Sequence, residues 1–176
     1  MNRKTSLIVM IGAAAIIAAP VSAKEYYVGE PITQNALQLV PHYLTDIEMA
    51  PMPAGMDMAK SAIHLEIDIH ATKDDKHGFA EDAWVPYLGV QYTIEKVGSS
   101  FKKRGRLYPM TAGDGPHYAS NLQLSGEGDY KVSFHVSPPS TNGFLRHVDA
   151  ATGVPDWWKP FDVQWTFHYP AKQNQG

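Results

Sequence analysis

The chain has 176 residues, a formal net charge of −3 and no cysteine. This length suits one domain with a hydrophobic core of its own. The mild acidity argues against nucleic acid and anionic membranes as partners. The lack of cysteine excludes disulfides, blue-copper centres, zinc–cysteine sites and cysteine nucleophiles.

The first 23 residues have the organisation of a secretory signal peptide. Basic Arg3 and Lys4 precede a short apolar run, residues 7–19, and small residues lead up to Ala23. The run is too short and too rich in alanine for a membrane span, and no cysteine follows that could carry a lipid. The sequence therefore predicts cleavage after Ala23, export to the periplasm, one domain over residues 24–176 and no membrane anchor.

The first segments of the expected domain are irregular. Residues 36–47 alternate only loosely between apolar and polar and contain Pro41, which favours an irregular edge strand, with His42 on its surface. A loop rich in proline and glycine follows over residues 48–58, and it carries four methionines. Methionines in such a loop often cap a hydrophobic core, and we favour this role for most of them. The alternative is that their thioethers offer soft donors to Cu(I).

Residues 63–70 have the clearest pattern in the chain, apolar at every odd position and ionisable at every even position. Side chains alternate across a β-strand, so the segment predicts a strand with an apolar core face. The other face carries His64, Glu66, Asp68 and His70, spaced roughly 6.6–7 Å apart. Their side chains could lean toward one bound ion. The alternative is a solvated edge strand whose charges discourage pairing with other sheets.

Further strands are expected over residues 88–96, 129–136 and 161–169, with a strand or turn near Arg104. Residues 112–118 form a predicted tight loop rich in glycine and proline. Trp157 and Trp158 should anchor the loop before the last strand to the core. The sequence contains no internal repeat and no long helical pattern, so short strands separated by turns predict an all-β sandwich.

Several side chains in or beside these elements could bind a metal ion. The candidates are His64, Glu66, His70, Met110, His117 and His147. Histidine and methionine without cysteine favour copper over zinc, and a carboxylate extends the choice to iron or manganese. Each residue also has an ordinary explanation: Met110 could fill the core, His117 could bond within its loop, and His147 could be an exposed basic residue. The residues alone do not decide whether the chain binds a metal ion.

The sequence gives little support to an enzyme. It contains no G-x-S-x-G motif, no phosphate-binding loop and no dinucleotide fingerprint. We therefore expect a binding protein and not a catalyst.

Three separated motifs carry a resemblance to a known family. They are residues 63–71, residues 109–118 and residues 146–153, supported by residues 46–49 and 84–88. In this order they resemble the periplasmic iron-transport family whose members bind copper and iron. The resemblance covers essentially all of residues 24–176.

The resemblance implies an immunoglobulin-like β-sandwich that forms a homodimer, with a copper site near the subunit interface, beside an inner-membrane iron permease. Carried over by position, the copper ligands are His64, Met110, His117 and His147, and Glu66 is a conditional fifth. In the family, the residue that matches His147 can come from across the dimer. Copper ion and iron ion are the implied cofactors.

The sequence also allows two other functions. One is a periplasmic copper chaperone or buffer in which residues 49–58 contribute thioethers. The other is a structural or carbohydrate-binding β-sandwich without a metal.

Overall fold

A computed structural model describes residues 25–58 and 63–171, which form strands, turns and one short 3-10 turn, η2 (Pro139–Asn142). The strands are β1 (Tyr26–Tyr27), β2 (Ile32–Gln34), β3 (Leu37–Thr45), β4 (Ile63–Ala71), β5 (Gly89–Lys96), β6 (Lys102–Ala112), β7 (Gly115–Leu122), β8 (Gly128–Ser137) and β9 (Phe161–Tyr169). No helix within these two ranges is long and apolar enough to cross a membrane. The predicted signal peptide lies outside the described residues.

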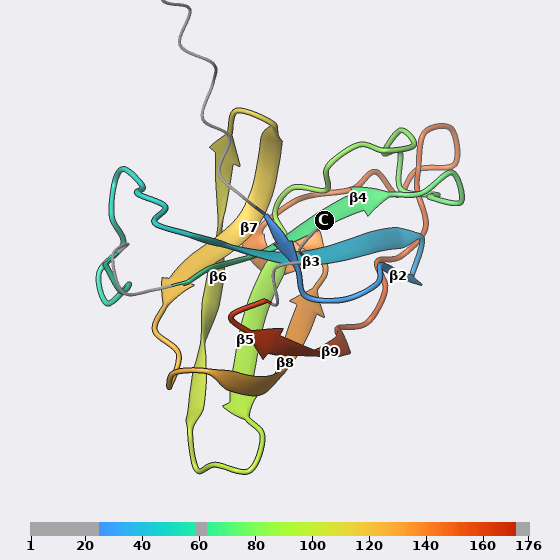
Figure 1. The fold of residues 1–176 in the computed structure, drawn as a ribbon. Coiled ribbons are helices and arrows are strands. Elements are labelled where there is room, and N and C mark those ends of the chain that lie inside the picture. Colours follow the sequence, from blue (N-terminus) through green and yellow to red (C-terminus); the bar gives the residue numbers. More distant parts are fainter. Residues whose placement is uncertain (1–24, 59–62, 172–176) are drawn as a thin grey trace, which may run out of the picture.

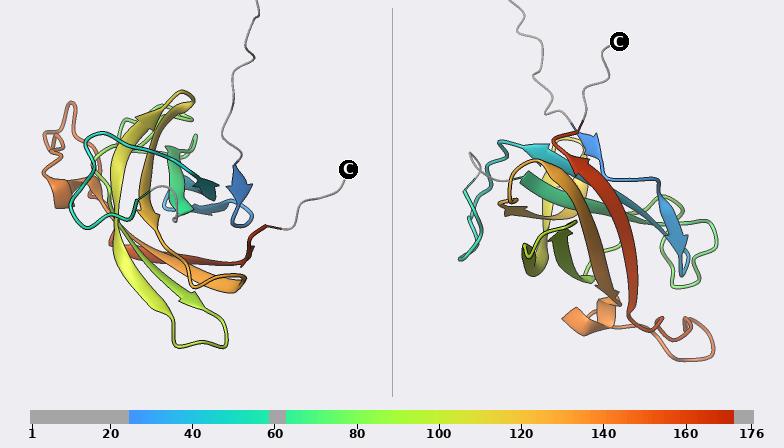
Figure 2. Two further views of the ribbon diagram at one scale, coloured as in Figure 1. Left: turned by 60° about the vertical axis from the view of Figure 1, so that its left-hand side comes forward. Right: turned by 60° about the horizontal axis from the view of Figure 1, so that its bottom comes forward.

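The strands form one antiparallel sheet that curls into two layers (Figure 1). Its order is β1-β3-β4-β7-β6-β5-β8-β9, and β2 pairs with the other end of β3. The long strand β6 belongs to both layers, because residues 102–107 pair with β5 and residues 108–112 pair with β7. Figure 2 shows β6, in yellow, running along the molecule between the two hairpin tips. The predicted all-β sandwich with a single domain is confirmed.

Strand β4 lies in the middle of the first layer, between β3 and β7. Its apolar residues Ile63, Leu65, Ile67 and Ile69 are buried in the core together with side chains of the second layer such as Phe134. The prediction of a strand here is confirmed. The alternative of a solvated edge strand is wrong, because strands cover both edges and the polar residues His64 and Glu66 are buried as well.

Strand β3 is not the edge strand that Pro41 suggested. β4 pairs along its whole length, and β1 and β2 pair with two separate parts of its other edge. Pro41 lies between those two parts, where its missing N–H is tolerated, and its carbonyl accepts a hydrogen bond from the Val28 N–H at 3.0 Å. His42 is only 5% exposed, so its predicted surface position is wrong.

The predicted loop over residues 112–118 is mostly strand. β6 continues to Ala112, β7 begins at Gly115, and only Gly113 and Asp114 remain for the turn. Gly115 has a φ of +144°, a conformation that side chains with a Cβ disfavour. The predicted strands over residues 88–96, 129–136 and 161–169 are confirmed by β5, β8 and β9, and Trp158 packs against the core as expected.

The core of β4 should be essential for stability. We expect Leu65→Ala to lower the free energy of unfolding by about 2–5 kcal/mol, because it removes a fully buried side chain from between the layers. The matched control is Val97→Ala, at a residue that is 60% exposed, which should change the free energy of unfolding by less than about 0.5 kcal/mol. Urea unfolding measures both, and equal effects would contradict this account of the core.

Candidate metal centre

The register of four neighbouring strands gathers polar side chains on the outer face of the first layer. On β3, His42 lies opposite Glu66 of β4. On β7, Asn121 lies opposite His64, and Met110 of β6 lies opposite His117 of β7. Because side chains alternate along each strand, all six of these residues project to the same side of the layer.

Three of these side chains converge closely enough to hold one ion. Nε2 of His64 and Nε2 of His117 each lie 3.6 Å from Oε2 of Glu66, and all three residues are buried. The two imidazole rings are perpendicular, with centroids 5.8 Å apart. An ion with ligand distances of about 2.1 Å in tetrahedral geometry separates its donors by about 3.4 Å. The spacing therefore fits a metal bound by His64, Glu66 and His117.

Asn121 fixes which nitrogen of His64 can bind a metal. The amide nitrogen of Asn121 donates to the Ile47 carbonyl at 2.9 Å, so its oxygen faces His64. That oxygen lies 2.7 Å from Nδ1 of His64 and can only accept, so Nδ1 carries the hydrogen. Nε2 is left with its lone pair directed toward Glu66. Outer partners of this kind orient metal-binding histidines in many proteins.

The electrostatics of the centre favour a metal over a proton. Burial lowers the pKa of His64, against opposing contributions from Asn121 and Glu66. His64 is therefore neutral at neutral pH, as a metal ligand must be. Nε2 of His117 is buried without a hydrogen-bond partner in the described part of the chain. A buried polar atom without a partner is costly, and a bound cation would satisfy it.

Met110 adds a soft donor to the same cavity. The cavity measures about 610 Å³ and is lined by His64, Glu66, Met110 and His117, with Asp114 at the hairpin turn. Thioether sulfur is preferred by Cu(I), whereas zinc rarely selects it. The structure thus brings together four of the five predicted metal ligands in one cavity.

The methionine-rich loop does not cap the core. None of its four methionines is buried: Met49 lines the cavity, whereas Met58 is 70% exposed. The core-capping role that we favoured for most of them is therefore wrong. The first part of the loop, up to Pro53, lines the cavity over the polar face of β4.

His147 lies apart from this cavity within the chain. It belongs to the projecting segment between η2 and β9, drawn in orange in Figure 2, and its side chain is 75% exposed. The Thr152 hydroxyl donates to Asp149, so it accepts from Nδ1 of His147 at 2.8 Å. Nε2 of His147 is therefore left with its lone pair.

Two residues beside the centre do not follow from the sequence pattern. The pattern indicates a surface position for His42, and it gives no sign of Asn121, which lies on the same face of its strand as His117. His70, a candidate ligand, lies outside the centre and faces Asp82 at 3.4 Å. Asp68 lies on the predicted polar face, 3.6 Å from His42.

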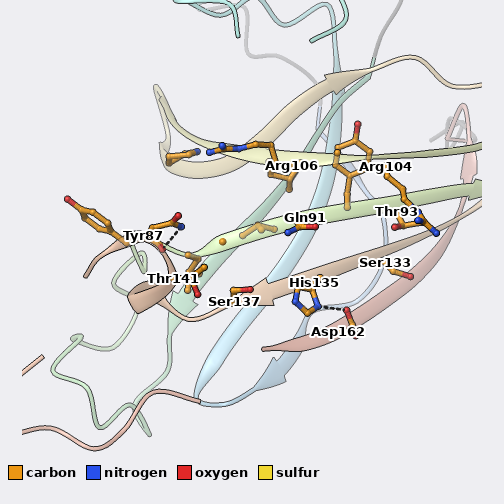
Figure 3. Close-up of a pocket in the computed structure, with 18 of the residues that line it drawn as sticks. Tyr87, Gln91, Thr93, Arg104, Arg106, Ser133, His135, Ser137, Thr141 and Asp162 are labelled. Carbon is orange, nitrogen blue, oxygen red and sulfur yellow. Dashed lines mark hydrogen bonds and ion pairs between the residues drawn. The ribbon is translucent and has the colours of Figure 1, made fainter. Parts of the chain in front are cut away.

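A second, larger cavity of about 890 Å³ lies on the outer face of the other layer (Figure 3). Figure 3 shows Arg104, Arg106, Gln91 and His135 around it, with His135 paired to Asp162 at 2.9 Å. In the described chain, the groups of histidines and carboxylates close enough to share one ion lie around Glu66 and not here. Among the described residues, this cavity therefore contains no group of donors able to share one ion.

Fold and site together define a β-sandwich protein with a buried donor set of the kind that binds copper. The family described as Fe2+ transport protein matches residues 22–171. The chain belongs to this family. A UPF0423 protein of Brucella abortus is 40% identical over 170 residues, which cover 95% of this chain and 93% of the relative. The 34 kDa membrane antigen of Treponema pallidum is 36% identical over 146 residues, covering 80% of this chain and 72% of the antigen.

Solved structures show the same fold. A copper-bound variant of FetP from uropathogenic Escherichia coli strain F11 has a TM-score of 0.81 and 46% identity, covering 85% of this chain and 99% of FetP. A copper-bound variant of Campylobacter jejuni P19 has a TM-score of 0.80 and 39% identity, covering 84% of this chain and 98% of P19. These similarities support the immunoglobulin-like sandwich that the sequence predicted.

Asn121 should affect copper binding without being a ligand. We expect Asn121→Ala to weaken copper affinity by about 10- to 100-fold, because His64 loses the bond that orients its ring. Asn142→Ala is the matched control, since that exposed amide donates to the Tyr87 carbonyl away from the centre. Competition titration with a copper chelator measures both variants. If Asn121→Ala bound copper as tightly as the control, the orienting role would be refuted.

Proposed function

We propose that this chain is a periplasmic, homodimeric protein that binds copper and iron and supports high-affinity iron uptake through an inner-membrane iron permease. The observation that carries the proposal is the convergence of His64, Glu66 and His117 in one buried cavity with Met110. Membership of the Fe2+ transport protein family and the copper-bound structures of FetP and P19 support it.

The donor set suits copper in either oxidation state. Two neutral imidazoles bind both states, the thioether of Met110 favours Cu(I), and the carboxylate of Glu66 favours Cu(II) or iron. His64, Met110 and His117 would hold the copper, and Glu66 would join them according to the oxidation state. The residues supply binding and orientation, so we propose a binding role and not a catalytic one.

The proposed location rests on two observations. Residues 1–23 have the pattern of a cleaved signal peptide. One solved structure of FetP is of protein that was expressed in the periplasm. The mature protein would then be residues 24–176, as predicted from the sequence.

The projecting segment supports a homodimer in which His147 completes the copper site of the second subunit. His147 lies between Leu145 and Val148, whose side chains are 88% and 75% exposed. Apolar side chains gathered in this way mark interaction surfaces. Trp157 stacks on His77 with ring centroids 4.7 Å apart and so braces the base of the segment. A second copy of the chain would cover these apolar residues. Its copper site would then receive Nε2 of His147 as a further ligand.

A copper chaperone or buffer is the alternative function. Exposed Met58 and Met52, with Met49 at the cavity, favour it, because thioethers at a surface can pass Cu(I) to another protein.

Growth of a deletion strain separates the two functions. In iron-poor medium, we expect the strain to grow poorly and to be restored by the intact gene or by the exposed-site control Met58→Leu. His117→Ala should not restore it, because the copper site loses a ligand. If the deletion affected growth only in copper excess, the chaperone or buffer function would replace the proposed one.

Mixed dimers test whether His147 binds the copper of the partner subunit. A chain with His147→Ala and a chain with His117→Ala, carrying different affinity tags, can be purified together. If His147 acts across the dimer, the mixed dimer contains one complete copper site, because each chain supplies what the other lacks. We expect its copper affinity to approach that of the parent at one site per dimer. Affinity no better than that of either single variant would show that His147 does not act in this way.

A further inference from the structure

The projecting segment that carries His147 is ordered by bonds within itself. Arg146 donates to the Val154 carbonyl at 3.0 Å and pairs with the carboxylate of Asp156. The Val154 N–H donates in turn to the carbonyl of His147 at 3.0 Å. These bonds fix His147 relative to Val154 and Asp156, so its position depends on what holds that returning part of the segment.

His77 links the returning part to the rest of the chain. It belongs to the loop that follows β4, and its Nε2 lies 3.2 Å from the carbonyl oxygen of Asp156. Its Nδ1 lies 3.3 Å from Oδ2 of Asp75 in its own loop. Both partners only accept hydrogen bonds, so a neutral imidazole bonds one of them and an imidazolium bonds both. The ring of His77 therefore bridges the segment and the loop.

Two tryptophans of the segment enclose this bridge. Trp157 stacks on the ring of His77 at an interplanar angle of 13°, and Trp158 meets it edge-on with ring centroids 5.3 Å apart. The side chain of His77 is only 12% exposed. Its bond to the segment is thus largely shielded from water, where a hydrogen bond is electrostatically stronger.

Asp75 fixes the other end of the bridge. Its side chain is only 1% exposed, and its Oδ1 accepts hydrogen bonds from two backbone N–H groups of its own loop at 2.8 and 3.0 Å. The Asp75 N–H donates to the Thr72 carbonyl at 3.0 Å, and the Thr72 N–H donates to the Ala36 carbonyl at 2.8 Å. The loop is therefore fixed to the sheet directly after β4.

We propose that His77 is a positioning residue for copper binding across the dimer. By holding Asp156 against the loop after β4, it keeps His147 where the copper site of the second subunit can receive it. The inference rests on the proposed role of His147 in the homodimer. It adds a physical link, through one imidazole, between a chain's own copper ligands on β4 and the ligand that the chain offers to its partner.

The competing role of His77 is purely structural. The bridge would then stabilise the fold around its loop and leave copper binding by His147 unaffected. The two roles differ in how His77→Ala and His147→Ala combine. A positioning residue acts on copper only through His147, so the two losses of affinity do not add, whereas effects of independent origin do.

Copper affinities of the parent, the two single variants and the double variant give this comparison, measured by competition titration. We expect His77→Ala to weaken copper binding by about tenfold, as the loss of an orienting partner does. The double variant should bind copper like His147→Ala alone. The matched control is His135→Ala, which removes a histidine paired with an aspartate on the other layer and should bind like the parent.

His77→Phe separates the bonds of the ring from its packing. It keeps a flat ring between the tryptophans and removes both nitrogens, so we expect the same loss of copper affinity as in His77→Ala. The inference is overturned if either variant binds copper like the control, or if the loss in His77→Ala adds to that in His147→Ala.

Hydrogen exchange of the projecting segment, measured by mass spectrometry on the same samples, keeps the two proposals apart. We expect exchange there to be about tenfold faster in His77→Ala than in the parent and the control, because the segment loses its link to the sheet. Unchanged exchange would overturn the inference. Faster exchange, together with parent-like copper affinity in His147→Ala, would instead refute the proposed role of His147, although His77 would still anchor the segment.

Discussion

The structure depends on the burial of a carboxylate in the middle of a sheet. Glu66 lies on a central strand, covered on one side by the core and on the other by residues 47–53 and the β6–β7 hairpin. A buried carboxylate needs partners of opposite charge or hydrogen-bond donors. The described chain offers no lysine or arginine there, only the imidazoles of His42, His64 and His117. The face is therefore suited to a cation, since imidazoles neutralise a carboxylate only by holding a proton or a metal.

Core and site are set by the same strand register. Ile63, Leu65 and Ile67 point to the core, and the residues between them point to the site. A slip of one residue would exchange the two faces, placing His64 and Glu66 in the apolar core. The apolar pattern that stabilises the sandwich therefore also keeps His64 opposite Asn121 and Glu66 opposite His42. In the same way, the two-residue turn of the β6–β7 hairpin holds Met110 opposite His117.

The sequence predicts those strands in which apolar and polar residues alternate strictly. The prediction is wrong where this alternation is loose. β4 and β9 are predicted because every second residue is apolar. The position of His64 and Glu66 on one polar face follows from the same alternation in β4. His42 was misplaced because Pro41 suggests an edge, whereas β1 pairs with His42 and Tyr43 across the intervening β2–β3 hairpin, and local alternation does not reveal that pairing. Asn121 depends on the pairing of β7 with β4, which no local pattern reveals. The place of His147 depends on a second subunit, so its assignment stays a prediction.

The two donor groups around Glu66 differ in character. On one side the carboxylate faces two imidazoles in a cavity with the thioether of Met110, and on the other it faces His42 and Asp68. If copper occupies the first group as proposed, it draws on the same carboxylate charge that a protonated His42 would balance. Binding of copper must then lower the proton affinity of His42, and by linkage the effect is equal in both directions. The shared carboxylate would thus couple copper at the buried centre to the charge of the imidazole on β3.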